Sequence, residues 1–411
     1  MIVNLGYKYK LVTNKTQKAL LFNHLFSHNQ AWNILLNESH KQYEQNKARI
    51  EKKESPVYLK NTEQDKIVKD ILLGRGLVFN TKVVQQTRVN FNKSFLATVK
   101  NLQSPETGML NFKKSTNFNH QSFETTKEQY KIKDVNNKYK ILKLFRQEFK
   151  IRWTRDFPIN SEAKSIKISF LNGDFFVSFN VSYENENEFH PNLRPEHTNK
   201  VGLDINISSI DIGNKDFHKA FNISNIKLNN LVEKNKKKIK RLQRKQSRRV
   251  LKKKKGEQLG KNFKKTQYKI NKIHTKNHNI KVFQLHKLVN EILLFLRENN
   301  LNHIIMEKLN VKEMTKSGKI NKVIGKKNSI AMKRNILHIS FHMLKEIITY
   351  KSANFGVYVS FVDPKNTSKT CSACGRIDKE LNLTKRIYNC GCGLSISRDY
   401  NACLNILNKI Y

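Results

Sequence analysis

Four cysteines late in the sequence constrain the fold of this chain more than any other feature. Cys371 and Cys374 form one pair, Cys390 and Cys392 form a second, and residues 375–389 separate them. Two thiolate pairs at this spacing match the ligand set of a tetrahedral zinc site. Four thiolates also fill the coordination sphere and leave no position open for water. The pattern therefore predicts one structural zinc ion at the centre of a small domain.

The net charge indicates the kind of partner. The chain has 411 residues, and its 78 Lys and Arg against 33 Asp and Glu give a formal charge of +45. Such an imbalance causes strong self-repulsion unless a polyanion neutralises it, and nucleic acid is the expected polyanion. An AT-rich genome would also raise the Lys content through codon usage, but codon bias would not deplete acidic residues so far. We therefore expect a large nucleic-acid interface.

Composition and length set the general class of protein. With 38% hydrophobic residues and only 6 Pro and 15 Gly, the chain is expected to form two or three globular domains. No run of about eighteen apolar residues predicts a membrane span, and residues 1–10 do not resemble a signal peptide. Zinc-binding cysteines fit a reducing compartment better than disulfides do. These patterns predict a cytoplasmic protein without a membrane partner.

Hydrophobic periodicity predicts the main elements. The first half begins with a strand over 2–12, continues with helices, and includes a hairpin over 166–181 that turns at Asn172-Gly173. A polar linker over 184–199 suggests a domain boundary. Residues 103–160 show no clear pattern. The second half predicts strands near 201–207, 210–213, 303–306 and 357–362, helices near 282–296 and 336–348, and a long helix from about Leu228.

Three acidic residues share an apolar setting. Asp204 lies in a buried-type strand, Glu307 ends another, and Asp399 begins an apolar helix. A carboxylate in such a place is costly unless something pairs with it. If the three converge on one edge of a sheet, they can hold two Mg²⁺ ions for attack on a phosphodiester. The alternative is that each acid caps a helix or pairs with one of the many lysines.

At these residues the chain resembles TnpB, the RNA-guided DNA endonuclease of insertion sequences and a relative of the compact type V CRISPR effectors. The resemblance is specific in the C-terminal half and looser in the N-terminal half, where Phe112-Lys113-Lys114 contributes. The matching segments are Gly202-Leu203-Asp204, Met306-Glu307-Lys308-Leu309-Asn310-Val311, Thr367-Ser368-Lys369-Thr370-Cys371-Ser372-Ala373-Cys374-Gly375 and Arg398-Asp399-Tyr400-Asn401-Ala402.

The resemblance implies an α/β multi-domain protein. A RuvC (RNase H-like) nuclease domain with an inserted zinc ribbon would follow a β-barrel wedge domain that carries a helical recognition insert. It also implies that Asp204, Glu307 and Asp399 bind Mg²⁺, and that the partners are a guide RNA and double-stranded target DNA. The expected domains are a wedge at 1–14 and 160–198, a helical insert at 15–159, a RuvC domain with a basic helical insert at 200–367, a zinc ribbon at 368–393 and a final RuvC segment at 394–411.

The chain departs from the family pattern at three places. Asn206 replaces a usual Gly, Ser397 replaces a common Asp, and the second cysteine pair is one residue tighter than usual. Asn tolerates the left-handed conformation that Gly adopts, so the first change is compatible with the fold. The tight pair is expected to reach one zinc ion, and Ser397 affects only an auxiliary acid.

Other candidate residues have simpler explanations. Cys403 is expected in the core, and His338 and His342 at a surface or packing position. Tyr7, Tyr9 and Trp32 are expected to be core residues, although they would also suit stacking on bases. Residues 234–255 hold 14 Lys or Arg and no acid, which favours phosphate contact over a merely solvated face.

The resemblance, together with the charge and the acid triad, implies an RNA-guided, Mg²⁺-dependent endonuclease of a transposable element that cuts DNA beside a short adjacent motif. Alternatives are a compact CRISPR effector, a nuclease-inactive RNA-guided repressor and a structural RNA-binding protein. The intact acid triad disfavours the last two. A transposase is disfavoured because no His-hydrophobe-His motif accompanies a candidate Tyr nucleophile.

Overall fold

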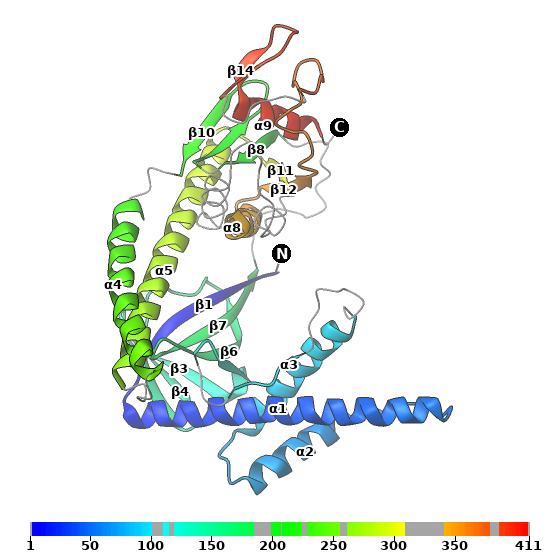
Figure 1. Ribbon diagram of the computed structural model, residues 1–411, viewed down its shortest axis with the longest axis vertical. Coiled ribbons are helices and arrows are strands. Elements are labelled where there is room, and N and C mark those ends of the chain that lie inside the picture. The colour runs from blue at the N-terminus through cyan, green and yellow to red at the C-terminus, as the bar shows by residue number, and fades with distance from the viewer. Residues whose placement is uncertain are drawn as a thin grey trace. The chain divides into compact units, whose positions relative to one another are not determined.

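The protein is described by a computed structural model that forms two compact units, residues 2–184 and residues 185–411 (Figure 1). Within the described part of the chain, no helix is both long enough and apolar enough to span a bilayer. The polar linker expected at 184–199 falls almost entirely outside the described residues. These are 2–100, 110–114, 119–184, 199–206, 208–223, 228–254, 261–308, 341–378 and 386–409.

The N-terminal unit contains a seven-stranded antiparallel sheet with the order β2-β6-β7-β1-β5-β4-β3. The predicted hairpin forms β6 and β7, and Asn172 and Gly173 both have positive φ, as a tight two-residue turn requires. The strands are β1 (Ile2–Val12), β2 (Ser122–Thr126), β3 (Tyr130–Asn136), β4 (Tyr139–Leu144), β5 (Gln147–Arg152), β6 (Glu162–Leu171) and β7 (Asp174–Glu184).

One face of this sheet forms an aromatic core. Tyr7 and Tyr9 of β1 are buried, whereas Lys8 and Lys10 between and after them are exposed. The Tyr9 ring stacks on Trp153 at a centroid distance of 4.2 Å, and its hydroxyl donates to the Arg155 carbonyl. The prediction that these tyrosines are core residues is therefore confirmed, and neither ring is free to stack on a base.

The predicted closed β-barrel is not confirmed. No backbone pairing joins the edge strands β2 and β3 among the described residues. The Tyr130 hydroxyl on β3 nevertheless donates to the Ala163 carbonyl on β6, so the sheet curls until its two ends approach. The strands alone therefore form an open, strongly curled sheet around one core.

The helical insert expected over 15–159 is only partly correct. Residues 15–100 contain the helices α1 (Lys15–Glu51), α2 (Asn61–Gly74) and α3 (Thr81–Lys100), but residues 122–152 add four strands to the sheet. Alternation explains these strands: in β5, Phe149 and Ile151 are buried and all the other residues are exposed. The outward faces of these strands are rich in lysine, so the sequence shows only a weak apolar alternation there and did not predict them.

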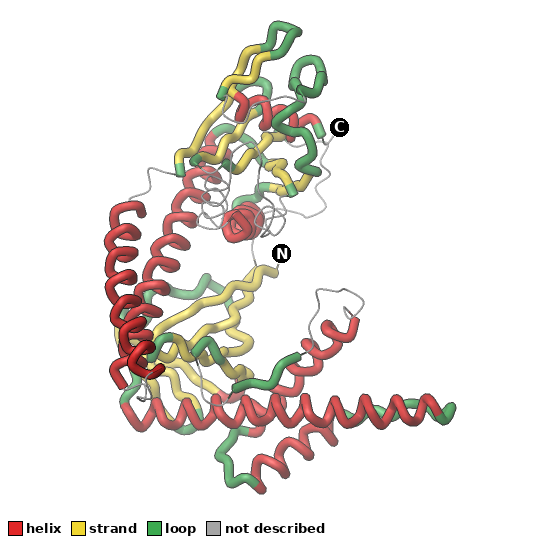
Figure 2. The backbone as a smooth tube through the Cα atoms, in the orientation of Figure 1, coloured by secondary structure: helices red, strands yellow, loops and turns green. Residues whose placement is uncertain are grey.

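Helix α1 is a long, continuous helix (Figure 2), and its residues contribute to two hydrophobic cores of the N-terminal unit. Asn14 caps its first turn: its side-chain oxygen accepts from the Gln17 backbone N–H, and the Gln17 side-chain oxygen accepts from the Asn14 backbone N–H. Leu21 and Leu25 then pack into the core of the sheet. Further along α1, the apolar residues pack instead against α2 and α3.

The C-terminal unit has a five-stranded sheet with the order β10-β9-β8-β11-β12. The central strands β8, β11 and β12 are parallel, β9 pairs antiparallel with β8, and β10 pairs antiparallel with β9. The strands are β8 (Lys200–Ile205), β9 (Ser209–Gly213), β10 (His218–Asn222), β11 (His303–Glu307) and β12 (Tyr358–Val362).

Helices cover both faces of this sheet. Helices α5 (Lys261–Glu298) and α8 (Phe341–Asn354) pack on the face that carries Leu203 and Ile304. Helix α9 (Arg398–Asn408) packs on the opposite face, against Ile305 and Gly202. The result is a three-layer α/β/α arrangement.

Two further features extend from this unit. Helix α4 (Leu228–Lys254) packs antiparallel on the first half of α5 and forms a helical hairpin with it. A short ribbon of β13 (Ile387–Asn389) and β14 (Ser395–Ser397) lies beside the second cysteine pair and leads into α9.

Candidate functional site

Asp204 and Glu307 lie on the same face of the sheet, at the ends of adjacent parallel strands. The β8–β11 register pairs Gly202 with Ile305, and continuing it places Asp204 beside Glu307. Side chains alternate between the two faces of a strand. Leu203 and Met306, which directly precede the two acids, belong to the core on one face, so both acids lie on the other face, which α9 covers. Parallel strands thus bring two carboxylates together from segments about 100 residues apart in the sequence.

Asp399 reaches the same face from the first turn of α9. The approach is close because Gly202 has no side chain: a Cβ at this position would lie 2.0 Å from the Cys403 carbonyl oxygen. Arg398 and Arg386 each place a guanidinium nitrogen 3.7 Å from an Asp399 carboxylate oxygen. The helix therefore delivers the third acid to the strand ends, with cationic neighbours beside it.

The negative charges of the other two acids act on Asp204. Burial, followed by the negative charges of Glu307 and Asp399, raises the pKa of Asp204 to about 8. Burial also raises the pKa of Glu307. A divalent cation beside Asp204 would neutralise the negative charges that raise its pKa. The donor chemistry of this cluster, oxygen atoms only, suits Mg²⁺.

A hydrogen-bond network that sequence reasoning missed surrounds Asp204. The Asn206 amide donates to one Asp204 oxygen at 3.0 Å and to the buried Asp211 at 3.3 Å. Asp211 also accepts from the Ser209 hydroxyl at 2.6 Å and pairs with His218 Nε2 at 3.0 Å. Asn206 therefore holds the carboxylate beside it. The signal in the sequence was a second acid, Asp211, in the next apolar strand.

A second missed residue holds Glu307. Thr367 is 2% exposed, and its hydroxyl donates to a Glu307 carboxylate oxygen. Thr367 lies four residues before Cys371, in a segment that the sequence associates with the zinc ribbon. Nothing in its sequence spacing indicated a contact with a strand 60 residues earlier.

The four cysteines come together in one cluster. Their Sγ atoms all lie within 4.8 Å of one another, with 3.7 Å between Cys371 and Cys392 and 3.6 Å between Cys374 and Cys390. Thiolates bound to one tetrahedral zinc ion at about 2.3 Å would be about 3.8 Å apart. The tight Cys390–Cys392 pair thus reaches the other two, and the cluster fits zinc.

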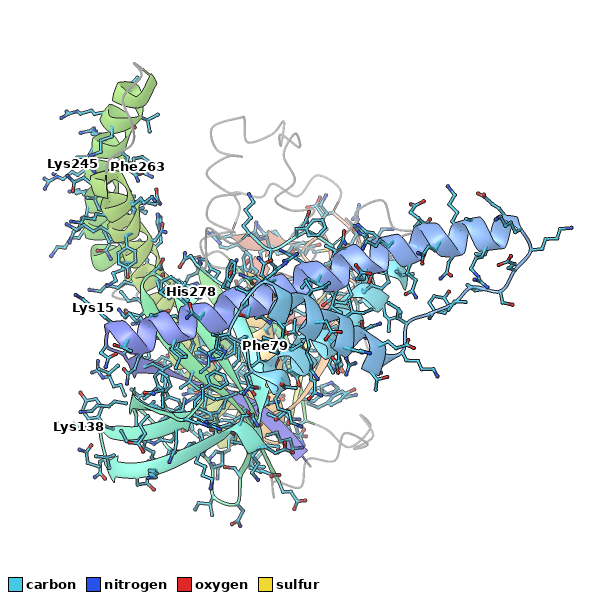
Figure 3. The ribbon with its side chains drawn as sticks, turned by 90° about the horizontal axis from the view of Figure 1, so that it is seen from below. Lys15, Phe79, Lys138, Lys245, Phe263 and His278 are labelled. Atoms are coloured by element: carbon cyan, nitrogen blue, oxygen red, sulfur yellow. The ribbon has the colours of Figure 1, made fainter. Side chains whose placement is uncertain are left out.

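The α4–α5 hairpin carries the densest positive charge. Ile239 is the buried residue in the described part of the basic run, and it lines a hollow together with His274 and His278 of α5. Lys237, Lys240 and Lys245 are exposed, and Figure 3 shows Lys245 projecting from the hairpin. The described part of the run, 234–254, therefore presents a basic outer face.

The weaker candidates are placed as follows. Cys403 is fully buried against Asp211, which confirms it as a core residue. His342 is exposed, whereas His338 lies outside the described residues. Trp32 packs edge-on against Phe91, and the Lys113 ammonium lies 4.1 Å from its ring centroid. Trp32 is thus a partly buried packing residue.

Two family models match this chain. Residues 341–406 match the model described as "Cas12f1-like, TNB domain", which includes the cysteine cluster and Asp399. Residues 1–48 match a model described as "Helix-turn-helix domain", although this segment forms β1 and most of α1. Both ends of the chain are therefore similar to known families.

Curated relatives cover parts of the chain. InsQ of Escherichia coli K12 is 27% identical over 262 residues, which is 62% of this chain and 59% of InsQ. The TnpB-like protein L79 of Acanthamoeba polyphaga mimivirus is 36% identical over 113 residues, 26% of this chain and 20% of that protein. The CRISPR-associated endodeoxyribonuclease Cas12f1 of Sulfoacidibacillus thermotolerans is 38% identical over 68 residues, 16% of each chain. The chain thus spans less than two thirds of these relatives.

A solved structure shares the fold. The Cas12f1 chain in a complex with its single guide RNA and target DNA matches with a TM-score of 0.56 and 17% identity, covering 95% of this chain and 83% of that one. At this identity the match supports the fold alone. The fold of this chain is therefore similar to that of the Cas12f1 chain.

Proposed function

The chain belongs to the TnpB family, and from this membership we propose that it is an RNA-guided DNA endonuclease of a transposable element. It would cut double-stranded DNA beside a short adjacent motif, using Mg²⁺. The observation that carries the proposal is the convergence of Asp204, Glu307 and Asp399 on one face of the sheet. This arrangement supplies the oxygen ligands that phosphodiester hydrolysis by metal ions requires.

The residues of the site have distinct roles in this proposal. The three acids would hold two Mg²⁺ ions, while Asn206 and Thr367 would each fix one oxygen of an acid. When bound, the metal supplies an activated water and a counter-charge for the leaving oxygen. Arg386 and Arg398 would balance the charge of Asp399 and keep its carboxylate turned toward the strand ends.

We assign the cysteine cluster to one structural zinc ion. The four Sγ atoms are spaced as in a closed tetrahedral site, which gives the ion a folding role and no catalytic one. The cluster lies in the segment that connects β12 to α9 and its acid.

Guide RNA and target DNA are the proposed partners. A charge of +45 is sufficient to bind a large polyanion, and the exposed lysines of α4 offer phosphate contacts that do not depend on sequence. Sequence choice would come from base pairing with the guide, and the protein would read the backbone and the adjacent motif.

The decisive experiment is cleavage with a reprogrammed guide. Protein purified with its RNA should cut a plasmid in Mg²⁺ at the site that the guide matches, and a new guide segment should redirect the cut. Asp204→Ala, Glu307→Ala and Asp399→Ala should each abolish cutting and leave target binding nearly unchanged. Wild-type cutting by Asp204→Ala would refute the assignment. Retargeted binding without cutting by the wild type would indicate a repressor instead.

A further inference from the structure

We propose that Thr367 is a positioning residue that holds the Glu307 carboxylate in its metal-binding orientation, and that the zinc ribbon keeps Thr367 in place. The inference rests on the proposed function, because it assigns a role in metal binding to Glu307. It concerns the segment 364–372, which links β12 to the first cysteine pair.

The hydroxyl of Thr367 has two acceptors in reach and one proton. One acceptor is a Glu307 carboxylate oxygen, and the other is the Pro364 carbonyl at 3.1 Å. The carboxylate is the stronger acceptor because it carries charge. Since Thr367 is 2% exposed, water cannot easily replace this bond. The bond restricts one oxygen of Glu307 and leaves the other available to a metal ion.

Two asparagines of α9 hold the backbone of this segment. The Asn405 amide donates to the carbonyls of Thr367 at 2.8 Å and Thr370 at 2.6 Å. Asn401 donates to the Thr370 carbonyl at 2.7 Å and accepts from the Ser372 N–H at 2.9 Å. Both asparagines are buried, so these bonds have no competition from solvent. Asp399 lies on the same helix, two residues before Asn401.

The cysteine knuckle fixes the other side of the segment. The Cys371 N–H donates to the Arg376 carbonyl at 2.8 Å, and the Gly375 N–H donates to the Cys371 carbonyl at 3.0 Å. Cys371 lies between Thr370 and Ser372, the two residues that Asn401 contacts. A metal ion held by the Cys371 thiolate would therefore lock the segment that positions Thr367. The five consecutive residues 367–371 would thus link the structural ion to the acid Glu307.

Hydrogen-bond partners of metal ligands commonly change metal affinity or activity 10–100-fold when they are removed. Valine has the shape of threonine without the hydroxyl, so Thr367→Val removes the bond to Glu307 and little else. Thr370→Val is the matched control, because the Thr370 hydroxyl donates within the same segment, to the Asn366 carbonyl at 2.9 Å. Thr367→Ser keeps a hydroxyl and should restore the wild-type behaviour.

The test uses the full chain with its co-purified RNA. We expect Thr367→Val to raise the Mg²⁺ concentration for half-maximal cleavage about tenfold or more, and to weaken Mn²⁺ binding measured by calorimetry by a similar factor. Target binding, zinc content and melting temperature should match those of Thr370→Val. Protein stripped of zinc should lose Mn²⁺ affinity in the same way.

Equal Mn²⁺ affinity in Thr367→Val and Thr370→Val would overturn the role of Thr367, and unchanged Mn²⁺ affinity after zinc removal would overturn the role of the ribbon. If Thr367→Val does not fold, Thr367→Ala compared with Thr370→Ala gives the same comparison. Absence of guided cleavage by the wild type, or wild-type cleavage by Glu307→Ala, would instead refute the proposed function. Calorimetry therefore distinguishes the two failures.

Discussion

Replacing His24 should make the N-terminal unit less sensitive to acid. His24 lies on α1 with 4% of its surface exposed, packed against the rings of Phe145 and Phe123 at centroid distances of 4.0 Å and 6.0 Å. Its Nδ1 atom is buried and has no hydrogen-bond partner among the described residues. Burial accordingly lowers the pKa of His24 from 6.5 to about 4.

The magnitude follows from the difference in pKa between the folded and unfolded states. Below pH 6.5 the unfolded chain binds a proton at His24, whereas the folded chain does so only near pH 4. Stability is therefore lost as the pH falls from 6.5 toward 4. At pH 5 the loss amounts to about 2 kcal/mol. His28, whose pKa burial also lowers, acts in the same direction but is present in both proteins.

Tryptophan fluorescence can measure this effect selectively. Both tryptophans, Trp32 and Trp153, lie in the N-terminal unit, so urea denaturation followed by their emission reports on that unit. Between pH 7.5 and pH 5, His24→Leu should lose about 2 kcal/mol less free energy of unfolding than the wild type. His40→Gln, an exposed position on the same helix, is the control and should lose as much as the wild type. Parallel losses in His24→Leu and the wild type would refute the reasoning.

Three further predictions concern the C-terminal unit. Gly202→Ala should destabilise it by about 3 kcal/mol or more, because the new methyl group meets the Cys403 backbone, whereas Gly74→Ala, with open space around it, should not; thermal unfolding of both variants tests this. Cys371→Ser should lower the zinc content from one ion per chain to near zero and reduce the melting temperature, as metal analysis and calorimetry would show; unchanged values would contradict the zinc assignment. Neutralising the exposed lysines of α4 should weaken nucleic-acid binding equally for all sequences and flatten its salt dependence, which filter binding at several salt concentrations would reveal; an effect on one sequence only would contradict phosphate contact.

Sequence patterns predicted the elements whose periodicity was strong. The hairpin of β6 and β7 was evident because apolar residues alternate on both sides of an Asn-Gly turn. The apolar strands β8 and β11 were equally clear. The strands between 122 and 152 were not, because their outward faces are lysine-rich and their inward residues are few. Weak alternation in a very basic chain is difficult to distinguish from a loop.

The candidate site was predictable only where residues carry their own chemistry. Cysteine spacing indicated a cluster that the structure forms, since four thiolates have few other uses. Carboxylates in apolar strands indicated Asp204 and Glu307 as a possible pair. Thr367 gave no signal and Asn206 stood out only as a replacement for Gly, because hydroxyl and amide side chains are common on any surface. Their roles depend on contacts across the fold, which composition and spacing do not specify.

The late position of α9 in the chain has a consequence for biosynthesis. Asp399 leaves the ribosome almost 200 residues after Asp204. The segment 367–370, which Asn401 and Asn405 of α9 contact, is made about 30 residues before Asp399. Contacts between segments so far apart form late in folding. The basic hairpin α4–α5 is synthesised before Asp399. If the proposed function is correct, a nascent chain would be able to hold RNA before it can cut DNA.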